Sequence, residues 1–211
     1  MGSAIVIGAG PGIGAAVARR FAAEGLPIGL IARKQSTVDT VAAGLSGVPV
    51  AGFTADVADE PALRAALAAA SHTLGPPEAV IYNAAIIQPD EPGELTMRAH
   101  LDAWTVNVLG ALTAAAHMAP SMAGGSFIIT GGMPTPDPRY TSLSLGKAGV
   151  RALVTLLDAH YRPAGIHVAT VTIAGPVAPG TPFDPTDIAE HYWHLHRQPL
   201  SHWQQEVVHV G

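Results

Sequence analysis

The sequence contains no cysteine. This absence excludes disulfide bonds, thiolate metal sites and a cysteine nucleophile. It is also typical of proteins that work in a reducing compartment, so we expect a cytoplasmic location.

Charged residues are scarce: they make up 13% of the 211 residues, whereas hydrophobic residues make up 48%. A chain of this length and composition can bury one full core, and disordered and fibrous classes are excluded. The net charge of −5 and the absence of a basic stripe argue against a nucleic-acid partner. No repeat, linker or charge block divides the chain, so we expect a single domain over residues 1–211.

Long apolar runs are also missing. None reaches the roughly 18 residues that a membrane-spanning helix needs. The apolar start at residues 4–7 has no basic leader and is soon interrupted by glycines, as in a buried strand followed by a turn. We therefore expect a soluble protein with no membrane partner.

Short apolar runs alternate with alanine-rich stretches of helical length. The strand-like runs are residues 4–7, 28–32, 49–54, 79–82, 127–130, 167–173 and 206–210. The helical candidates are residues 13–23, 36–44, 61–71, 101–122, 141–162 and 187–195. This alternation predicts an α/β fold of Rossmann type: a doubly wound, mostly parallel, seven-stranded sheet with helices on both faces.

Glycines cluster in residues 8–14, between the first strand and the first helix. Gly8 can take the tight turn, Gly12 lets the backbone approach a pyrophosphate, and Gly14 lets the helix pack closely on the strand. The helix that begins at Ile13 offers free N–H groups and partial positive charge to phosphates. A glycine turn in this strand–turn–helix context indicates a dinucleotide site.

Two cations, Arg33 and Lys34, follow the second strand. A site specific for NAD usually has an acid here, which accepts hydrogen bonds from the adenosine ribose. A guanidinium can instead grip a 2′-phosphate with two hydrogen bonds. The pair therefore favours NADP(H), the alternative being two solvated charges at the end of a strand.

Several motifs in the same order resemble those of the short-chain dehydrogenase/reductase family over nearly the whole chain. They are the glycine spacing GxxxGxG at residues 8–14, Asp56-Val57 after the third strand, Tyr82-Asn83-Ala84-Ala85 after the fourth, Asn107, Gly146-Lys147-Ala148 and Gly175-Pro176-Val177. The resemblance implies an oxidoreductase that binds a nicotinamide cofactor.

The resemblance also implies a role for each of these residues in the cofactor site. Asp56 and Val57 look like the pair that contacts the adenine. Asn83 and Ala84 belong to a turn that is Asn-Asn-Ala-Gly in the family, and Val177 is placed to meet the nicotinamide carboxamide. Lys147 would contact the nicotinamide ribose.

Two of the family's catalytic residues, Asn107 and Lys147, are present, but two others are replaced. The usual tyrosine, four residues before the lysine, is Leu143 here, and the usual serine is Gly132 or Gly131. Leucine cannot donate a proton, and a positioned general acid is worth about 10²–10⁴ in rate.

Other proton donors remain open. Tyr140, seven residues before Lys147, could be a displaced acid if the helix began early, or it could lie in the preceding loop. A partly desolvated Lys147 could have a lowered pKa and act as the acid, directly or through water. Thr130 is a further possible donor, although the end of a buried strand favours a local backbone role.

Two other kinds of site are not expected. His191 and His194 lie three residues apart and could form a zinc pair, but no acidic ligands stand at a recognisable spacing, so we expect no metal. Ser46, Ser121 and Ser126 have no neighbouring histidine and acid that would indicate a hydrolase.

The sequence thus predicts an NADP(H)-dependent oxidoreductase with an atypical active site, acting on a small carbonyl, imine or activated alkene. The alternative is a catalytically impaired NADP(H)-binding protein that acts as a sensor or structural partner. The helices at 101–122 and 141–162 are apolar on more than one face, and members of the resembling family pair through them. We therefore expect a homodimer or homotetramer.

Overall fold

The computed structural model describes residues 2–211. The strands are β1 (Ser3–Ile7), β2 (Ile28–Ala32), β3 (Val50–Thr54), β4 (Pro77–Tyr82), β5 (Gly125–Thr130), β6 (Ile166–Ile173) and β7 (Glu206–His209). The α-helices are α1 (Ile13–Ala23), α2 (Gln35–Ala43), α3 (Glu60–Leu74), α4 (Met97–Trp104), α5 (Gly110–Met118), α6 (Thr141–Tyr161) and α7 (Pro185–Arg197). Shorter helices are the π-helical η1 (Thr105–Leu109) and the 3₁₀ turns η2 (Ala119–Ser121), η3 (Arg162–Ala164) and η4 (Leu200–His202).

The strands form one sheet in the order β3-β2-β1-β4-β5-β6-β7, and every neighbouring pair is parallel. The strand order reverses between β1 and β4, so the connections leave these two central strands in opposite directions. In open parallel sheets, ligands bind beside the carboxyl ends of the strands at this switch point. The predicted doubly wound, seven-stranded fold is confirmed.

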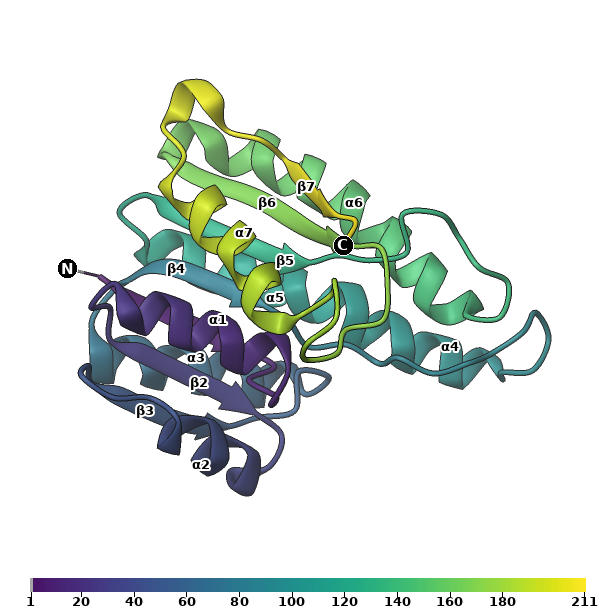
Figure 1. Ribbon diagram of the computed structural model, residues 1–211, viewed down its shortest axis with the longest axis horizontal. Helices are drawn as coiled ribbons and strands as arrows, with labels where there is room; N and C mark the ends of the chain where they lie inside the picture. Colours follow the sequence, from purple (N-terminus) through teal and green to yellow (C-terminus); the bar gives the residue numbers. More distant parts are fainter. Residues whose placement is uncertain (1) are drawn as a thin grey trace.

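Helices cover both faces of the sheet (Figure 1). α1 and α7 lie side by side on one face, whereas α3, α5 and α6 lie on the other. Each layer has its own apolar core, with Phe21, Ile28 and Tyr192 in the first and Leu63 and Phe127 in the second. The strands β1 and β2 are buried along their whole length, and apart from Ser3 they contain no polar side chain, as expected for a parallel sheet covered on both faces.

The prediction of one uninterrupted helix over residues 101–122 is wrong. The helical segment begins earlier, at Met97, where the Thr96 side chain accepts a hydrogen bond from Ala99 N–H, and α5 ends at Met118. Between α4 and α5, the π-helical turn η1 inserts one extra residue into the hydrogen-bond ladder. π-turns inside α-helices occur frequently at functional sites.

Side-chain contacts account for the π-turn. The Asn107 side chain lies against the loop after β4, where its Oδ1 accepts from Ile86 N–H (2.8 Å) and its Nδ2 donates to Ile86 C=O (3.3 Å). The Tyr82 hydroxyl donates to the Val106 carbonyl at 2.5 Å. Gly110 makes room for this hydroxyl, since a Cβ at that position would lie 2.2 Å from it.

A buried carboxylate fixes the start of α6. Asp90, 1% exposed, accepts hydrogen bonds from Ser142 N–H (2.9 Å) and the Ser142 hydroxyl (2.8 Å). It therefore caps α6 from the loop that follows β4, and its negative charge lies at the positive end of the helix dipole. Lys147 follows in the second turn of this helix.

Within residues 2–211, no helix has the length and apolar character needed to cross a membrane.

Candidate functional site

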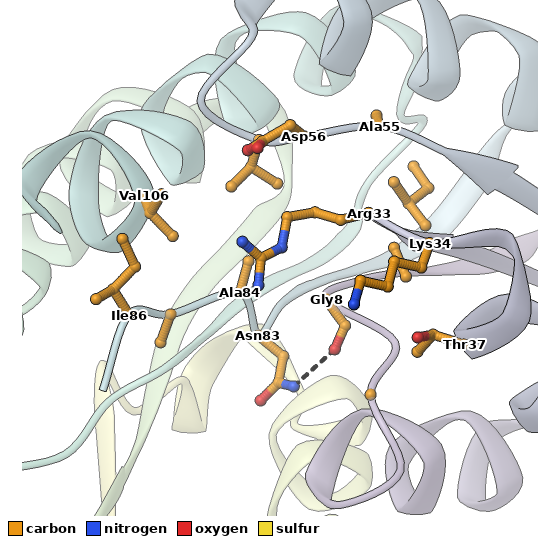
Figure 2. Close-up of a pocket in the computed structure, with 15 residues that line it drawn as sticks. Gly8, Arg33, Lys34, Thr37, Ala55, Asp56, Asn83, Ala84, Ile86 and Val106 are labelled. Atoms are coloured by element: carbon orange, nitrogen blue, oxygen red, sulfur yellow. Dashed lines mark hydrogen bonds between the residues drawn. The ribbon is translucent and has the colours of Figure 1, made fainter. Parts of the chain in front are cut away.

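A cleft of about 360 Å³ lies at the carboxyl ends of β1, β2, β3 and β4 (Figure 2). Seven of the predicted cofactor residues line it: Gly8, Arg33, Lys34, Asp56, Val57, Asn83 and Ala84. The other lining residues were not predicted: Gly10, Ile31, Ala32, Thr37, Ala55, Ala85, Ile86 and Val106. Of these, only Thr37 had a usable signal, because it lies one helical turn after Lys34 at the start of α2.

Two glycines of the turn are required by close backbone contacts. Gly8 has a φ of +82°, and a Cβ there would lie 2.4 Å from the Ala84 nitrogen. A Cβ on Gly14 would lie 2.5 Å from the Gly8 carbonyl oxygen. An added Cβ on Gly12, by contrast, would meet no protein atom within 4 Å, so that side of the turn is open to a ligand.

The N-terminus of α1 offers hydrogen-bond donors on this open side. Ala15 N–H donates back to Gly10 C=O (2.9 Å) and Ala16 N–H to Gly12 C=O (3.1 Å). Among the described residues, the amides of Ile13 and Gly14 have no backbone acceptor, as expected at a helix start, although Gly12, Ile13 and Gly14 are not part of the cleft lining. Free amides and the positive end of a helix form a phosphate site.

The end of β2 gives the cleft a positive charge. Arg33 and Lys34 are both exposed, and neither forms an ion pair within residues 2–211. In Figure 2 the Arg33 side chain extends into the cleft, and that of Lys34 runs toward Gly8 and Thr37. This region is suited to a phosphate group, because α2 also begins here and directs its positive end toward it.

Lys147 is buried, and no carboxylate within residues 2–211 forms an ion pair with it. It is 6% exposed, and its Nζ donates to the Thr130 carbonyl at the end of β5, at 2.7 Å. Burial lowers its pKa to about 8, because a charged ammonium is poorly solvated there. The helix that carries Lys147, α6, packs directly on η1, since a Cβ on the preceding Gly146 would lie 2.9 Å from Asn107 Cβ. Neither Lys147 nor Asn107 lines the cleft, but Asn107 holds Ile86, which does.

Tyr140 and Val177 also lie outside the cleft lining. Tyr140 immediately precedes α6, and its N–H donates to Asp137 C=O (3.0 Å). The early helix start that would place Tyr140 and Lys147 on one helix face is therefore wrong. Val177 is 38% exposed in the loop that connects β6 and α7.

The structure distinguishes the two glycines that could stand at the serine position. A Cβ on Gly131 would lie 2.5 Å from Thr170 Oγ1 and 2.6 Å from Thr172 Oγ1, so no side chain fits there. A Cβ on Gly132 would meet nothing closer than 3.6 Å, and the stem of Lys147 is 3.8 Å away. Gly132 is therefore the position beside the lysine that can accept a side chain.

Sequence reasoning missed Tyr192, which lies outside the cleft lining but is linked to a cleft residue by hydrogen bonds. The hydroxyl of Tyr192, in α7, lies 2.6 Å from Thr130 Oγ1. Thr130 Oγ1 in turn lies 2.9 Å from Asn83 Oδ1, in the cleft. No spacing signal links residues that are 62 positions apart.

The fold brings a histidine and an acid that are distant in the sequence close to Ser126. Its Oγ lies 2.8 Å from His196 Nδ1, and His196 Nε2 lies 3.8 Å from Glu78 Oε1. Ser126 is 0% exposed and lies near the amino end of β5, so no substrate can reach its hydroxyl. The arrangement connects α7 to the sheet and does not form a hydrolase site.

His191 and His194, the pair considered for zinc, do not bond to each other. His191 pairs with His209 (Nε2 to Nδ1, 3.0 Å) and not with His194. Among the described residues, no three side chains of the His, Cys, Asp or Glu type come close enough together to hold a metal ion.

The two glycines after β5 should respond differently to serine. We expect Gly131→Ser to lower the free energy of unfolding by about 1–3 kcal/mol, because the new side chain overlaps two threonine hydroxyls. Gly132→Ser should change it by less than about 1 kcal/mol. Urea unfolding of the two variants measures this difference. Equal costs would show that the steric distinction is wrong.

Known proteins share both the sequence pattern and the fold. A family model for short chain dehydrogenases matches residues 3–185. Galactitol 2-dehydrogenase (L-tagatose-forming) of Cereibacter sphaeroides is 30% identical over 172 residues, which cover 78% of this chain and 67% of that protein.

Two solved structures show how far the fold likeness extends. A short-chain dehydrogenase from Rhodopseudomonas palustris superposes with a TM-score of 0.85 at 27% identity, covering 98% of this chain and 96% of the other. An NADPH-bound short chain oxidoreductase from Pseudomonas aeruginosa PAO1, described as containing an atypical catalytic center, has a TM-score of 0.88 at 20% identity, covering 99% and 96%. With the family match extending from β1 to the start of α7, the chain belongs to the short chain dehydrogenase family of oxidoreductases.

Proposed function

We propose that this protein is an NADP(H)-dependent oxidoreductase that transfers a hydride to or from a small carbonyl, imine or activated alkene. The observation that carries the proposal is the cleft itself. At the switch point of the sheet, it joins the glycines that begin the turn to two cations without ion-pair partners among residues 2–211, and the free amides of α1 follow directly on that turn.

The residues fit a phosphorylated dinucleotide. The amides of Ile13 and Gly14 would bind the pyrophosphate across the open side of Gly12. Arg33 and Lys34 would bind the 2′-phosphate, with the Thr37 hydroxyl as a further donor beside them.

The remaining predicted residues would hold the two ends of the cofactor. Asp56 and Val57 would contact the adenine, and Asn83 and Ala84 would contact the central part of the molecule. Lys147 would hold the nicotinamide ribose, and Val177 would meet the carboxamide. When bound, the nicotinamide would supply or accept the hydride.

The proton donor differs from the tyrosine usual in this family. Leu143 is buried and has no proton to give, and Gly132 has no hydroxyl. Lys147 carries an N–H donor with a pKa of about 8. Near neutral pH its ammonium is therefore mostly protonated, and it releases a proton more readily than an ordinary lysine does. An iminium or an activated alkene needs less protonation than a ketone at this position, and for this reason we include these acceptors among the substrates.

One structural neighbour at 20% identity is also described as having an unusual catalytic center. The Pseudomonas aeruginosa oxidoreductase is bound to NADPH, and its catalytic center is described as atypical. In this chain Asn107 would hold the cleft wall at Ile86 and the water near Lys147, and Tyr140 is the second candidate acid.

The cofactor preference is directly testable. We expect NADPH to bind at least about tenfold more tightly than NADH, and Arg33→Ala to remove most of this difference, at a cost of about 1.5–3 kcal/mol. Fluorescence titration with both cofactors measures the two affinities. Arg64→Ala, on α3, is the matched control because it removes an exposed arginine outside the cleft lining. Equal affinity, or a preference for NADH, would contradict the proposal.

The role of Lys147 predicts a particular pH dependence. If its ammonium supplies the proton, the reduction rate should fall about tenfold per pH unit above the pKa of about 8, because the protonated fraction falls. Lys147→Met should weaken NADPH binding modestly and reduce turnover by at least about a hundredfold. Initial rates across a panel of ketones, imines and enones, at pH 6 to 10 as roughly the accessible range, provide the measurement.

Tyr140→Phe is the comparison variant for this experiment. Tyr140 would be the acid instead if this variant lost most of its rate and the reduction rate of the parent protein did not fall above pH about 8. If NADPH binds but no compound in the panel is reduced, the protein is a cofactor-binding sensor or partner and not an enzyme.

We also propose that the protein is a homodimer or homotetramer with two-fold symmetry. Large apolar side chains are exposed along α4, α5 and α6, and Leu145 and Leu156 lie three helical turns apart on one face of α6. Leu156→Glu should convert a dimer or tetramer into a smaller species in light scattering at micromolar concentration, whereas Leu200→Glu, on η4, should not. A monomeric parent protein would refute this assembly.

A further inference from the structure

A chain of hydrogen bonds joins α7 to the glycine turn through the interior of the sheet. The Tyr192 hydroxyl, 0% exposed, lies 2.6 Å from Thr130 Oγ1, at the end of β5. Thr130 Oγ1 donates to Asn83 Oδ1 at 2.9 Å. Asn83 Nδ2 donates to the Gly8 carbonyl at 2.9 Å, and Figure 2 shows this second bond as a dashed line. The chain thus crosses from α7 to β5 and then, through the residue after β4, to the residue after β1.

The direction of each proton follows from the chemistry of the groups. A carboxamide oxygen only accepts, so Thr130 gives its single hydroxyl proton to Asn83. The Tyr192 hydroxyl must then donate to Thr130, and burial favours this because it raises the pKa of Tyr192 and keeps the phenol protonated. A flipped Asn83 amide would place two carbonyl oxygens against each other at Gly8, so the chain fixes the orientation of this amide.

The last acceptor in this chain of hydrogen bonds is the carbonyl of Gly8, the residue at which the glycine turn begins. Gly8 has the positive φ that starts the turn, and its carbonyl also accepts from Gly10 N–H at 2.8 Å. The same oxygen lies against Gly14, at the start of α1. Holding this one carbonyl therefore orients the peptides that lead to the free amides of α1.

Thr130 also connects the chain to the lysine. Its side chain is the middle of the hydroxyl chain, and its main-chain carbonyl accepts from Lys147 Nζ at 2.7 Å. The end of β5 is thus a common support for Asn83 and Lys147, and the Tyr192 hydroxyl forms a hydrogen bond between it and α7.

We propose that Tyr192 and Thr130 are positioning residues for the dinucleotide site, acting through Asn83 on the Gly8 turn. The inference rests on the proposed function, because it assigns to α7 a part in setting cofactor affinity. Neither residue lines the cleft, so both act through the residues that do.

Two readouts of the unmodified protein and its variants test the proposal. The first is amide hydrogen exchange of residues 9–15 without any cofactor, and the second is NADPH affinity by titration. Thr130→Val keeps the side-chain shape and removes the hydroxyl, so we expect faster exchange in this segment and about fivefold to tenfold weaker NADPH binding. Thr130→Ser should restore both values.

The remaining variants separate positioning from general stability. Tyr192→Phe should cause a smaller loss, and adding it to Thr130→Val should cause no further loss, because the two act through one chain. The matched control is Thr170→Val, which removes another buried threonine hydroxyl, bonded to Ile129 C=O at 2.9 Å. It should lower overall stability and leave the turn and the NADPH affinity unchanged.

Each outcome decides one of the two proposals. If Thr170→Val affects residues 9–15 as much as Thr130→Val does, or if neither affects them, the positioning role is refuted. If the parent protein does not bind NADPH, the proposed function fails. Hydrogen exchange still shows whether the hydrogen bonds from Tyr192 through Thr130 and Asn83 hold the turn. Should Thr130→Val fail to fold, Tyr192→Phe compared with Thr170→Val gives the same decision.

Discussion

The backbones of two strands meet where β1 and β4 end, and most features of the site depend on this contact. A Cβ at residue 8 would lie 2.4 Å from the Ala84 nitrogen, so the approach is possible only for glycine. With the two chain segments this close, the Asn83 amide reaches the Gly8 carbonyl, and the connection can turn at once into α1. The glycine turn and the end of β2 then line the same cleft, and the free amides of α1 follow directly on that turn.

The second constraint is the buried charge of Lys147. An ammonium removed from water needs acceptors, and the only hydrogen bond formed by this one within residues 2–211 is to the Thr130 carbonyl. Without a carboxylate nearby, desolvation dominates and lowers the pKa to about 8. The same burial that weakens the lysine as a base makes its ammonium a better acid, which suits a site where Leu143 replaces a phenol.

Local patterns predicted the parts of the fold that depend on neighbouring residues. The strands, the glycine turn and the cations after β2 each lie in one short stretch, and seven of the predicted cofactor residues line the cleft. The π-turn was not predictable, because it depends on the Asn107 side chain bonding to Ile86, in a loop that follows another strand. The same reason applies to Asp90 and Ser142, which are 52 residues apart.

The contacts of α7 show most clearly what sequence patterns omit. Tyr192 and His196 lie one turn apart on the same face of the helix, and Thr130 and Ser126 lie on one face of β5. Tyr192 bonds to Thr130 at the carboxyl end of the strand, and His196 bonds to Ser126 near its amino end, so the helix runs antiparallel to the strand.

These polar contacts add to the apolar packing of α7 against the sheet. A shift by one helical turn would leave two buried hydroxyl groups and a buried imidazole without partners, at a cost of about 1–3 kcal/mol each. The two polar contacts therefore help to fix the register of α7 on β5. Once that register is set, the Tyr192 hydroxyl is fixed against Thr130, and a helix near the end of the chain helps to define the turn at its beginning.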